Sequence, residues 1–163
     1  MSRRDDFIAR FGGVFEHSPW VAEDAYDADL PSALTADGLH RLLCAAMRAA
    51  PRERKLALIA AHPDLAGRLL RIGRLTDASS AEQASAGLDR LNDSDFESFT
   101  ALNRAYRDKF GIPFVMAVKG RTCEEILAAF KTRLRNDEAA EFEIALTEIE
   151  RIAWLRITDI MNF

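Results

Sequence analysis

Residues 93–111 read DSDFESFTALNRAYRDKFG, and their large apolar side chains recur every three or four positions. That spacing places them on one face of an α-helix. Asp93 or Ser94 can cap the start by accepting a backbone N–H bond, and Gly111 can end the helix. The stretch predicts a long amphipathic helix whose buried face carries Phe96, Phe99, Leu102, Tyr106 and Phe110.

The chain before this stretch shows the same signals for helix starts and ends. Apolar residues again recur at helical spacing between capping residues, prolines and glycines. In the predicted helix from Pro51 to about Ala61, we expect Leu56, Ile59 and Ala60 to face inward. Four helices are predicted: a short one that stops at Gly12, one opened by Ser18 and Pro19 that runs to about Ala28, one capped by Thr35, and one from Pro51 to about Ala61.

The chain after residue 78 holds further helix starts. Residues 79–82 (SSAE) and 122–125 (TCEE) have the form of capping boxes, in which a Ser or Thr side chain and an acidic side chain satisfy the first backbone N–H groups. A last long helix is predicted from about Glu138, with apolar residues recurring as far as Ile157.

Two places depart from this pattern. His62 precedes Pro63, which disfavours helical backbone in the residue before it, so His62 is predicted to lie in a joint between helices. Residues 112–118 (IPFVMAV) are apolar without helical period, and Pro113 argues against a central strand. We expect buried, extended chain there.

Strand-like alternation and hairpin signals are absent from the sequence, as are internal repeats and low-complexity linkers. The patterns together predict an all-α fold of about eight helices without a sheet. The length of 163 residues suits one compact domain, and we expect residues 1–163 to form it.

Composition narrows the classes of function. The chain has 22 Lys and Arg against 26 Asp and Glu, a net charge of −4, so nucleic acid is not an expected partner. No signal peptide or membrane span is evident, and the two cysteines are not spaced as metal ligands, so we expect a cytoplasmic protein without a metal site. Nucleotide, zinc-protease and acyl-enzyme motifs are also absent.

Three residues could carry chemistry. His62 follows a helix end and carries an imidazole, a group that can gain or lose a proton near neutral pH, but a histidine there can also simply cap the helix. Glu82 sits at a helix start that suits an anionic ligand, although its capping box already gives the carboxylate a structural task. Arg156 borders the apolar face of the last helix, where an arginine is commonly solvated or salt-bridged.

An ordered series of motifs resembles the 2-oxo-4-hydroxy-4-carboxy-5-ureidoimidazoline (OHCU) decarboxylase family. The resemblance covers about residues 11 to 157 and is mildly broken at Ile112 and Lys119, where the family often has other residues. The motifs include residues 15–23 (FEHSPWVAE), 62–67 (HPDLAG), 75–76 (LT) with Ser79, 82–83 (EQ), 86–88 (AGL), 102–103 (LN) with Tyr106, 109–114 (KFGIPF), 117–118 (AV), and 152–153 (IA) with Arg156.

The resemblance implies a cofactor-free helical enzyme, usually a homodimer, that forms (S)-allantoin at the end of urate breakdown. It implies that the histidine of the His-Pro-Asp-Leu motif, here His62, is catalytic, and we expect Glu82 to assist it. The implied contacts with the small-molecule substrate are Pro63, Ser79, Ser80, Ala81, Glu82, Gln83, Phe114, Val115, Met116, Ala117, Val118 and Arg156.

Two other functions remain open at this point. A non-catalytic helical interaction module would use the apolar segment around Phe114 to bind a partner and would need neither His62 nor Glu82. A hydrolase acting upstream on 5-hydroxyisourate would need a strand-rich pattern, which this sequence lacks.

The two roles of Glu82 can be separated by Glu82→Gln. We expect turnover to fall, and we expect the free energy of unfolding to fall by about 1 kcal/mol if the capping interaction is lost. Thermal melting should therefore accompany the kinetics. A lower melting temperature with unchanged turnover would reduce Glu82 to a helix cap.

Overall fold

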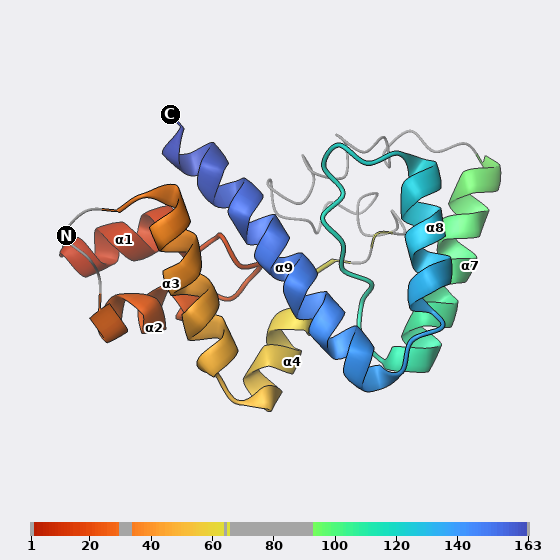
Figure 1. The fold of residues 1–163 in the computed structure, drawn as a ribbon, viewed down its shortest axis with the longest axis horizontal. Coiled ribbons are helices and arrows are strands. Elements are labelled where there is room, and N and C mark those ends of the chain that lie inside the picture. The colour runs from red at the N-terminus through yellow and green to blue at the C-terminus, as the bar shows by residue number, and fades with distance from the viewer. Residues whose placement is uncertain (1, 30–33, 64, 66–92, 163) are drawn as a thin grey trace. The chain divides into compact units, whose positions relative to one another are not determined.

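The computed structural model describes residues 2–29, 34–63, 65 and 93–162. All regular structure in these residues is helical and no strand occurs among them, which confirms the all-α prediction (Figure 1). The helices are α1 (Arg3–Phe11), α2 (Trp20–Asp29), α3 (Ala36–Ala49), α4 (Arg52–Ala60), α7 (Asp93–Phe110), α8 (Cys123–Arg133) and α9 (Glu138–Met161).

The chain forms two compact units. The first unit consists of residues 1–61 and 149–163, and the second unit of residues 62–148. Helix α9 contributes its first half to the second unit and its second half to the first. A single domain over residues 1–163 stays a prediction.

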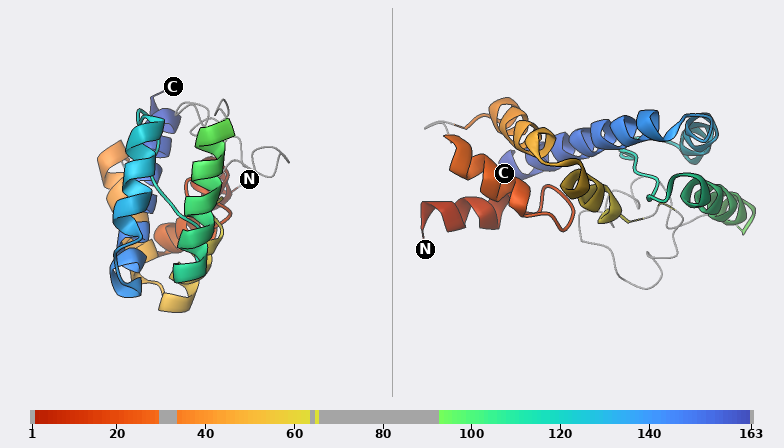
Figure 2. Two further views of the ribbon diagram at one scale, coloured as in Figure 1. Left: turned by 90° about the vertical axis from the view of Figure 1, so that its right-hand side faces the viewer. Right: turned by 90° about the horizontal axis from the view of Figure 1, so that it is seen from below.

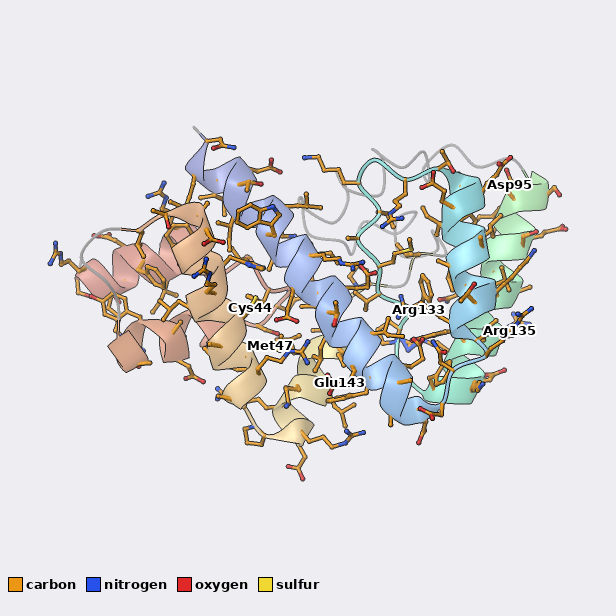
Figure 3. All side chains as sticks on the ribbon, viewed as in Figure 1. Cys44, Met47, Asp95, Arg133, Arg135 and Glu143 are labelled. Atoms are coloured by element: carbon orange, nitrogen blue, oxygen red, sulfur yellow. The ribbon has the colours of Figure 1, made fainter. Side chains whose placement is uncertain are left out.

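The first unit is built on helices α1 to α3, with α2 packed against both α1 and α3. Ser2 and Asp5 form a capping box at the start of α1, and the Thr35 side chain accepts a bond from the Gly38 N–H at the start of α3. The α3 side chains turned toward the second half of α9 include Cys44 and Met47 (Figure 3). The start of α3 lies where Thr35 predicted it, whereas the cap at Ser2 was not predicted from the sequence.

Two details of the first unit differ from the sequence prediction. Helix α2 begins at Trp20, because the Pro19 carbonyl accepts its first helical bond, while the Ser18 hydroxyl donates to the Glu16 carbonyl. In α4 the buried residues are Leu58 and Ile59, and Ala60 is exposed. The nine-residue helix gives only two turns, too few for periodicity to fix its inward face.

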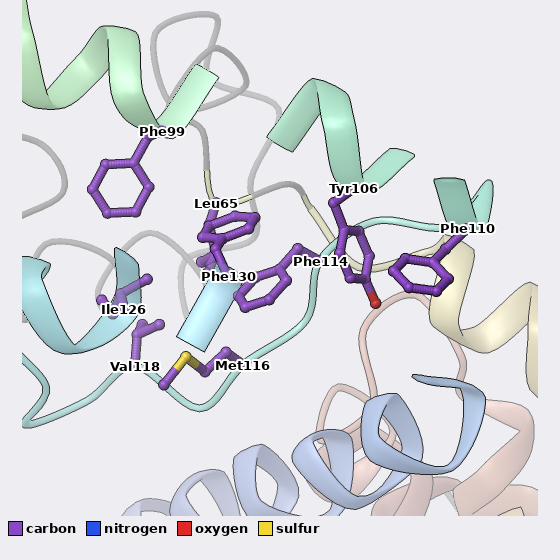
Figure 4. Packing of buried hydrophobic residues seen from close by; sticks show 9 residues of the cluster. All are labelled: Leu65, Phe99, Tyr106, Phe110, Phe114, Met116, Val118, Ile126 and Phe130. Atoms are coloured by element: carbon purple, nitrogen blue, oxygen red, sulfur yellow. The ribbon is translucent and has the colours of Figure 1, made fainter. Parts of the chain in front are cut away.

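The second unit places α7 beside α8 (Figure 2), and aromatic side chains form part of its core. The Phe114 and Phe130 rings stack with centroids 3.7 Å apart, and Tyr106 meets Phe114 edge-on at 5.1 Å (Figure 4). Gly111, with φ of +69°, ends α7 in the left-handed conformation that glycine adopts without steric cost. Residues 93–111 therefore form the predicted helix and its predicted stop.

Residues 113–118 are neither helix nor strand, as expected from Pro113 and the missing helical period. The side chains of Phe114, Val115, Met116 and Val118 are buried. The segment therefore crosses the core of the second unit without a backbone hydrogen-bond ladder of its own.

In the part of the chain that the structure describes, no helix is both long and apolar enough to cross a membrane.

Phe130→Ala should lower the free energy of unfolding by about 3 to 5 kcal/mol, because it removes a fully buried ring and leaves a cavity against Phe114. Urea denaturation measures the loss. The neighbouring Lys131 is exposed, so Lys131→Ala should change stability by less than about 0.5 kcal/mol. Equal effects of the two substitutions would contradict the packing described.

Candidate functional site

His62 lies where the sequence predicted it, in a joint between helices. Helix α4 ends at Ala60, Ala61 is its C-cap, and His62 forms a bend before Pro63. The residue His62 is only 6% exposed. A buried imidazole is shielded from bulk water, a setting that favours proton transfer to a bound ligand.

Leu65 joins the His62 motif to the segment at residues 113–118. It is 4% exposed and belongs to the same apolar cluster as Phe114, Met116 and Val118 (Figure 4). Within the second unit, two stretches singled out from the sequence therefore pack together although about 50 residues separate them.

The backbone of this segment is held by two charged side chains. Arg133 Nη1 donates to the Val115 carbonyl at 2.6 Å, and the Ala117 N–H donates to Glu148 Oε2 at 3.2 Å. Arg133 and Glu148 come from α8 and α9 and are both buried. Sequence analysis missed both residues, because charged side chains on a helix are usually solvated.

Arg133 is itself fixed by a buried network. Its Nη2 and Nε donate to Glu141 Oε2 at 2.9 and 3.1 Å, and Asn136 Nδ2 donates to Glu141 Oε1 at 3.0 Å. The Tyr106 hydroxyl also donates to Glu141 Oε2, at 2.5 Å. Burial and this bond to a carboxylate raise the pKa of Tyr106 well above its usual range, so the phenol stays protonated.

The side chains of the segment are used for packing. Phe114 lies between the Phe130 ring and the Arg133 guanidinium, whose carbon is 4.2 Å from the Phe114 centroid. Met116 and Val118 belong to the same buried cluster. A ligand bound along this segment would therefore meet mainly backbone N–H and C=O groups.

Arg156 belongs to the first unit, where it is 6% exposed and paired rather than solvated. Its Nη2 donates to Glu16 Oε2 at 2.8 Å, and its Nη1 donates to the Val14 carbonyl at 3.3 Å. The carboxylate of Glu16 is fully buried. Sequence analysis did not select Glu16 as a site residue, although it stands in the motif at residues 15–23 that carried the resemblance.

The turn that carries Glu16 has an unusual backbone. His17 has φ of +49°, a left-handed conformation that costs a non-glycine residue roughly 1 to 2 kcal/mol. Bonds from the Ser18 N–H to the Phe15 carbonyl and from the Ser18 hydroxyl to the Glu16 carbonyl hold the turn. The motif therefore folds into a fixed turn beside the Arg156 pair.

The predicted residues Ser79, Ser80, Ala81, Glu82 and Gln83 lie outside the described residues, so their part in a site stays a prediction. Among the residues that are described, no group of three His, Cys, Asp or Glu side chains could hold a metal ion. Burial raises the pKa of Cys44 to about 12, which makes this thiol a poor nucleophile at neutral pH.

Comparison with known proteins identifies the family of this chain. The sequence model described as OHCU decarboxylase matches residues 1–158. A 2-oxo-4-hydroxy-4-carboxy-5-ureidoimidazoline decarboxylase of Haloferax volcanii is 46% identical over 155 residues, which are 95% of this chain and 89% of that protein. This chain belongs to the OHCU decarboxylase family.

Two further comparisons agree with membership of the OHCU decarboxylase family. A decarboxylase of the same name from Halalkalicoccus jeotgali is 40% identical over 157 residues, which are 96% of this chain and 86% of that protein. The crystal structure of an (S)-allantoin synthase superposes with a TM-score of 0.78 at 32% identity and covers 98% of this chain. This chain spans about half of that longer protein, 51% of its length.

In this OHCU decarboxylase family member, Tyr106→Phe should lower the free energy of unfolding by about 1.5 to 3 kcal/mol at pH 7, because it removes a hydrogen bond to a buried carboxylate. The raised pKa of Tyr106 adds a pH dependence. The hydrogen bond of Tyr106 contributes fully to the free energy of unfolding below the pKa of tyrosine in the unfolded chain, about 10. This contribution is lost as pH rises toward the higher pKa of Tyr106 in the folded protein.

Denaturant unfolding of both proteins between pH 7 and 11 measures this dependence. The difference between wild type and Tyr106→Phe should shrink above about pH 10. Tyr26→Phe, the same change at the other tyrosine, serves as the control. A difference in the free energy of unfolding that stays constant up to pH 11 would contradict the raised pKa of Tyr106.

Proposed function

We propose that this chain catalyses the cofactor-independent decarboxylation of OHCU to (S)-allantoin and CO2, in the breakdown of urate. The observation that carries the proposal is the match to decarboxylases of that name over nearly the full length of both chains. The matched part includes the buried His62 and the segment held by Arg133 and Glu148.

The chemistry of the substrate explains how such a reaction can proceed without a cofactor. One ring carbon of OHCU carries both a carboxylate and a hydroxyl, beside a C=N bond. When CO2 leaves, the electron pair of the broken C–C bond forms a C=C bond, and the imine π pair moves to nitrogen, which takes a proton. The enol then loses its hydroxyl proton while the carbon bearing the ureido group gains one, which gives allantoin.

His62 is proposed as the general acid and base in this sequence. It accepts the hydroxyl proton as the enol becomes a carbonyl, and its burial keeps bulk water away from the intermediate. Glu82 is proposed to orient His62 or the ureido group. One positioned acid–base group contributes typically about 100- to 10,000-fold to a rate.

The remaining predicted residues are proposed to bind the substrate. Pro63 follows the proposed catalytic histidine, and Ser79, Ser80, Ala81 and Gln83, where the sequence predicts a helix start, are proposed to offer backbone N–H groups to oxygen atoms. The stretch from Phe114 to Val118 offers backbone groups, and Arg156 is proposed to contact a carbonyl or anionic oxygen, with Glu16 fixing the plane of its guanidinium. By the same resemblance, we propose that the enzyme works in the cytoplasm as a homodimer.

A coupled assay tests the proposal. Urate and the two upstream enzymes generate the unstable substrate in place, and circular dichroism follows the appearance of (S)-allantoin. Wild type should give rapid formation of the S enantiomer, and His62→Asn should slow it by at least about 100-fold.

The control is His17→Asn, the same substitution at an exposed histidine whose left-handed backbone asparagine tolerates. It should keep turnover within about twofold of wild type. Near-normal turnover by folded His62→Asn would remove His62 from the mechanism. If folded wild type gives only the slow racemic background, the family resemblance reflects common ancestry without this activity. The non-catalytic interaction module is then the favoured function.

A further inference from the structure

The segment at residues 113–118 is fixed at two backbone groups that flank a single residue. Arg133 binds the carbonyl of Val115, and Glu148 binds the N–H of Ala117. Met116 lies between them. Because the segment is neither helix nor strand, it has no regular ladder to set the direction of these groups, and the two side chains supply that constraint.

Peptide geometry converts these two bonds into a constraint on Met116. The Val115 carbonyl and the Met116 N–H belong to one planar peptide unit, and the Met116 carbonyl and the Ala117 N–H belong to the next. Neither peptide is cis, so the N–H and C=O within each unit point in opposite directions. Holding the outer groups therefore turns the N–H and the C=O of Met116 away from Arg133 and Glu148.

The backbone of Met116 makes no hydrogen bond to another residue of the described ranges. Its side chain is 7% exposed and packs in the apolar cluster with Leu65, close in sequence to His62. A backbone donor and a backbone acceptor on one residue match a ligand edge that carries both N–H and C=O, as a cyclic ureide does.

The anchors themselves are buried charged side chains. Arg133 has an 8% exposed side chain and is fixed by both oxygens of Glu141, whose side chain is fully buried. Glu148 is 8% exposed. A buried ion pair is often no more stable than apolar residues of the same volume, so stability alone is a weak reason for these charges. Their geometry, in contrast, sets the direction of two peptide planes.

We propose that Arg133 and Glu148 are positioning residues: by fixing the peptide planes on either side of Met116, they aim its N–H and C=O at the N–C=O edge of a cyclic ureide substrate. The identity of the substrate rests on the proposed function, whereas the anchoring of the segment does not.

A matched pair of variants at Glu148 tests the proposal. Glu148→Gln keeps an oxygen that can accept the Ala117 N–H, and Glu148→Met has similar length without an acceptor. In the coupled assay, Glu148→Met should raise KM by about 3- to 10-fold, the value of one hydrogen bond, with a smaller change in kcat. Glu148→Gln should keep KM within about twofold. The same pair at exposed Glu143 on α9 should leave both constants unchanged.

Amide hydrogen exchange gives a readout that does not depend on activity. Exchange at residues 115–118 should quicken in Glu148→Met and stay near the wild-type rate in Glu148→Gln. Arg133→Lys, which keeps the charge but loses the forked geometry, should quicken the same amides if it folds. If Arg133→Lys does not fold, hydrogen exchange in Glu148→Met and Glu148→Gln alone tests the anchoring of the segment.

Two results would overturn the proposal. Equal loss of stability in both Glu148 variants with wild-type KM would make Glu148 a structural residue only. Equal loss of kcat in Glu148→Gln and Glu148→Met would mean that the carboxylate charge itself takes part in the reaction. If wild type forms no (S)-allantoin, the proposed function fails, and unchanged exchange in Glu148→Met would separately refute the anchoring.

Discussion

The buried pair of Arg133 and Glu141 is the interaction on which the second unit depends. Placing two charges in an apolar core is unfavourable unless each is matched, and here the guanidinium meets both carboxylate oxygens while Tyr106 and Asn136 complete the shell of Glu141. The same arginine reaches the Val115 carbonyl and covers one face of the Phe114 ring. One side chain thereby links α7, α8 and α9 to a segment that has no secondary structure.

The first unit uses a related arrangement. Arg156 pairs with the buried Glu16 and donates to the carbonyl of Val14, which lies in a non-helical stretch between α1 and α2. In both units, then, an arginine on a helix combines a buried carboxylate with a loop carbonyl. A helical protein must satisfy the backbone of its irregular segments without a sheet, and a planar guanidinium with several donors suits that task.

The sequence predicted the elements that depend on local chemistry. Helix starts at Thr35 and Thr122 follow from capping, the start near Glu138 from apolar periodicity, and the stop at Gly111 from glycine conformation, and the structure confirms them. The inward face of short α4 was partly wrong because two turns carry little periodic signal. Glu16, Arg133, Glu141 and Glu148 were missed because their burial depends on partners distant in sequence, which no local pattern reveals. The position of His62 in a joint between helices was predicted from Pro63, a local constraint.

The buried side chains of Phe114, Val115, Met116 and Val118 have a consequence for how this stretch can vary over evolution. If the main chain alone meets the ligand, inherited changes among apolar residues of equal volume leave recognition untouched, and selection acts there on packing. Residue identity is then strictly constrained only at positions that do not touch the ligand but hold the backbone of the segment. A family alignment would then show variable residues in the segment that meets the ligand and invariant residues at the positions that hold its backbone. This is the reverse of the pattern by which binding residues are usually sought.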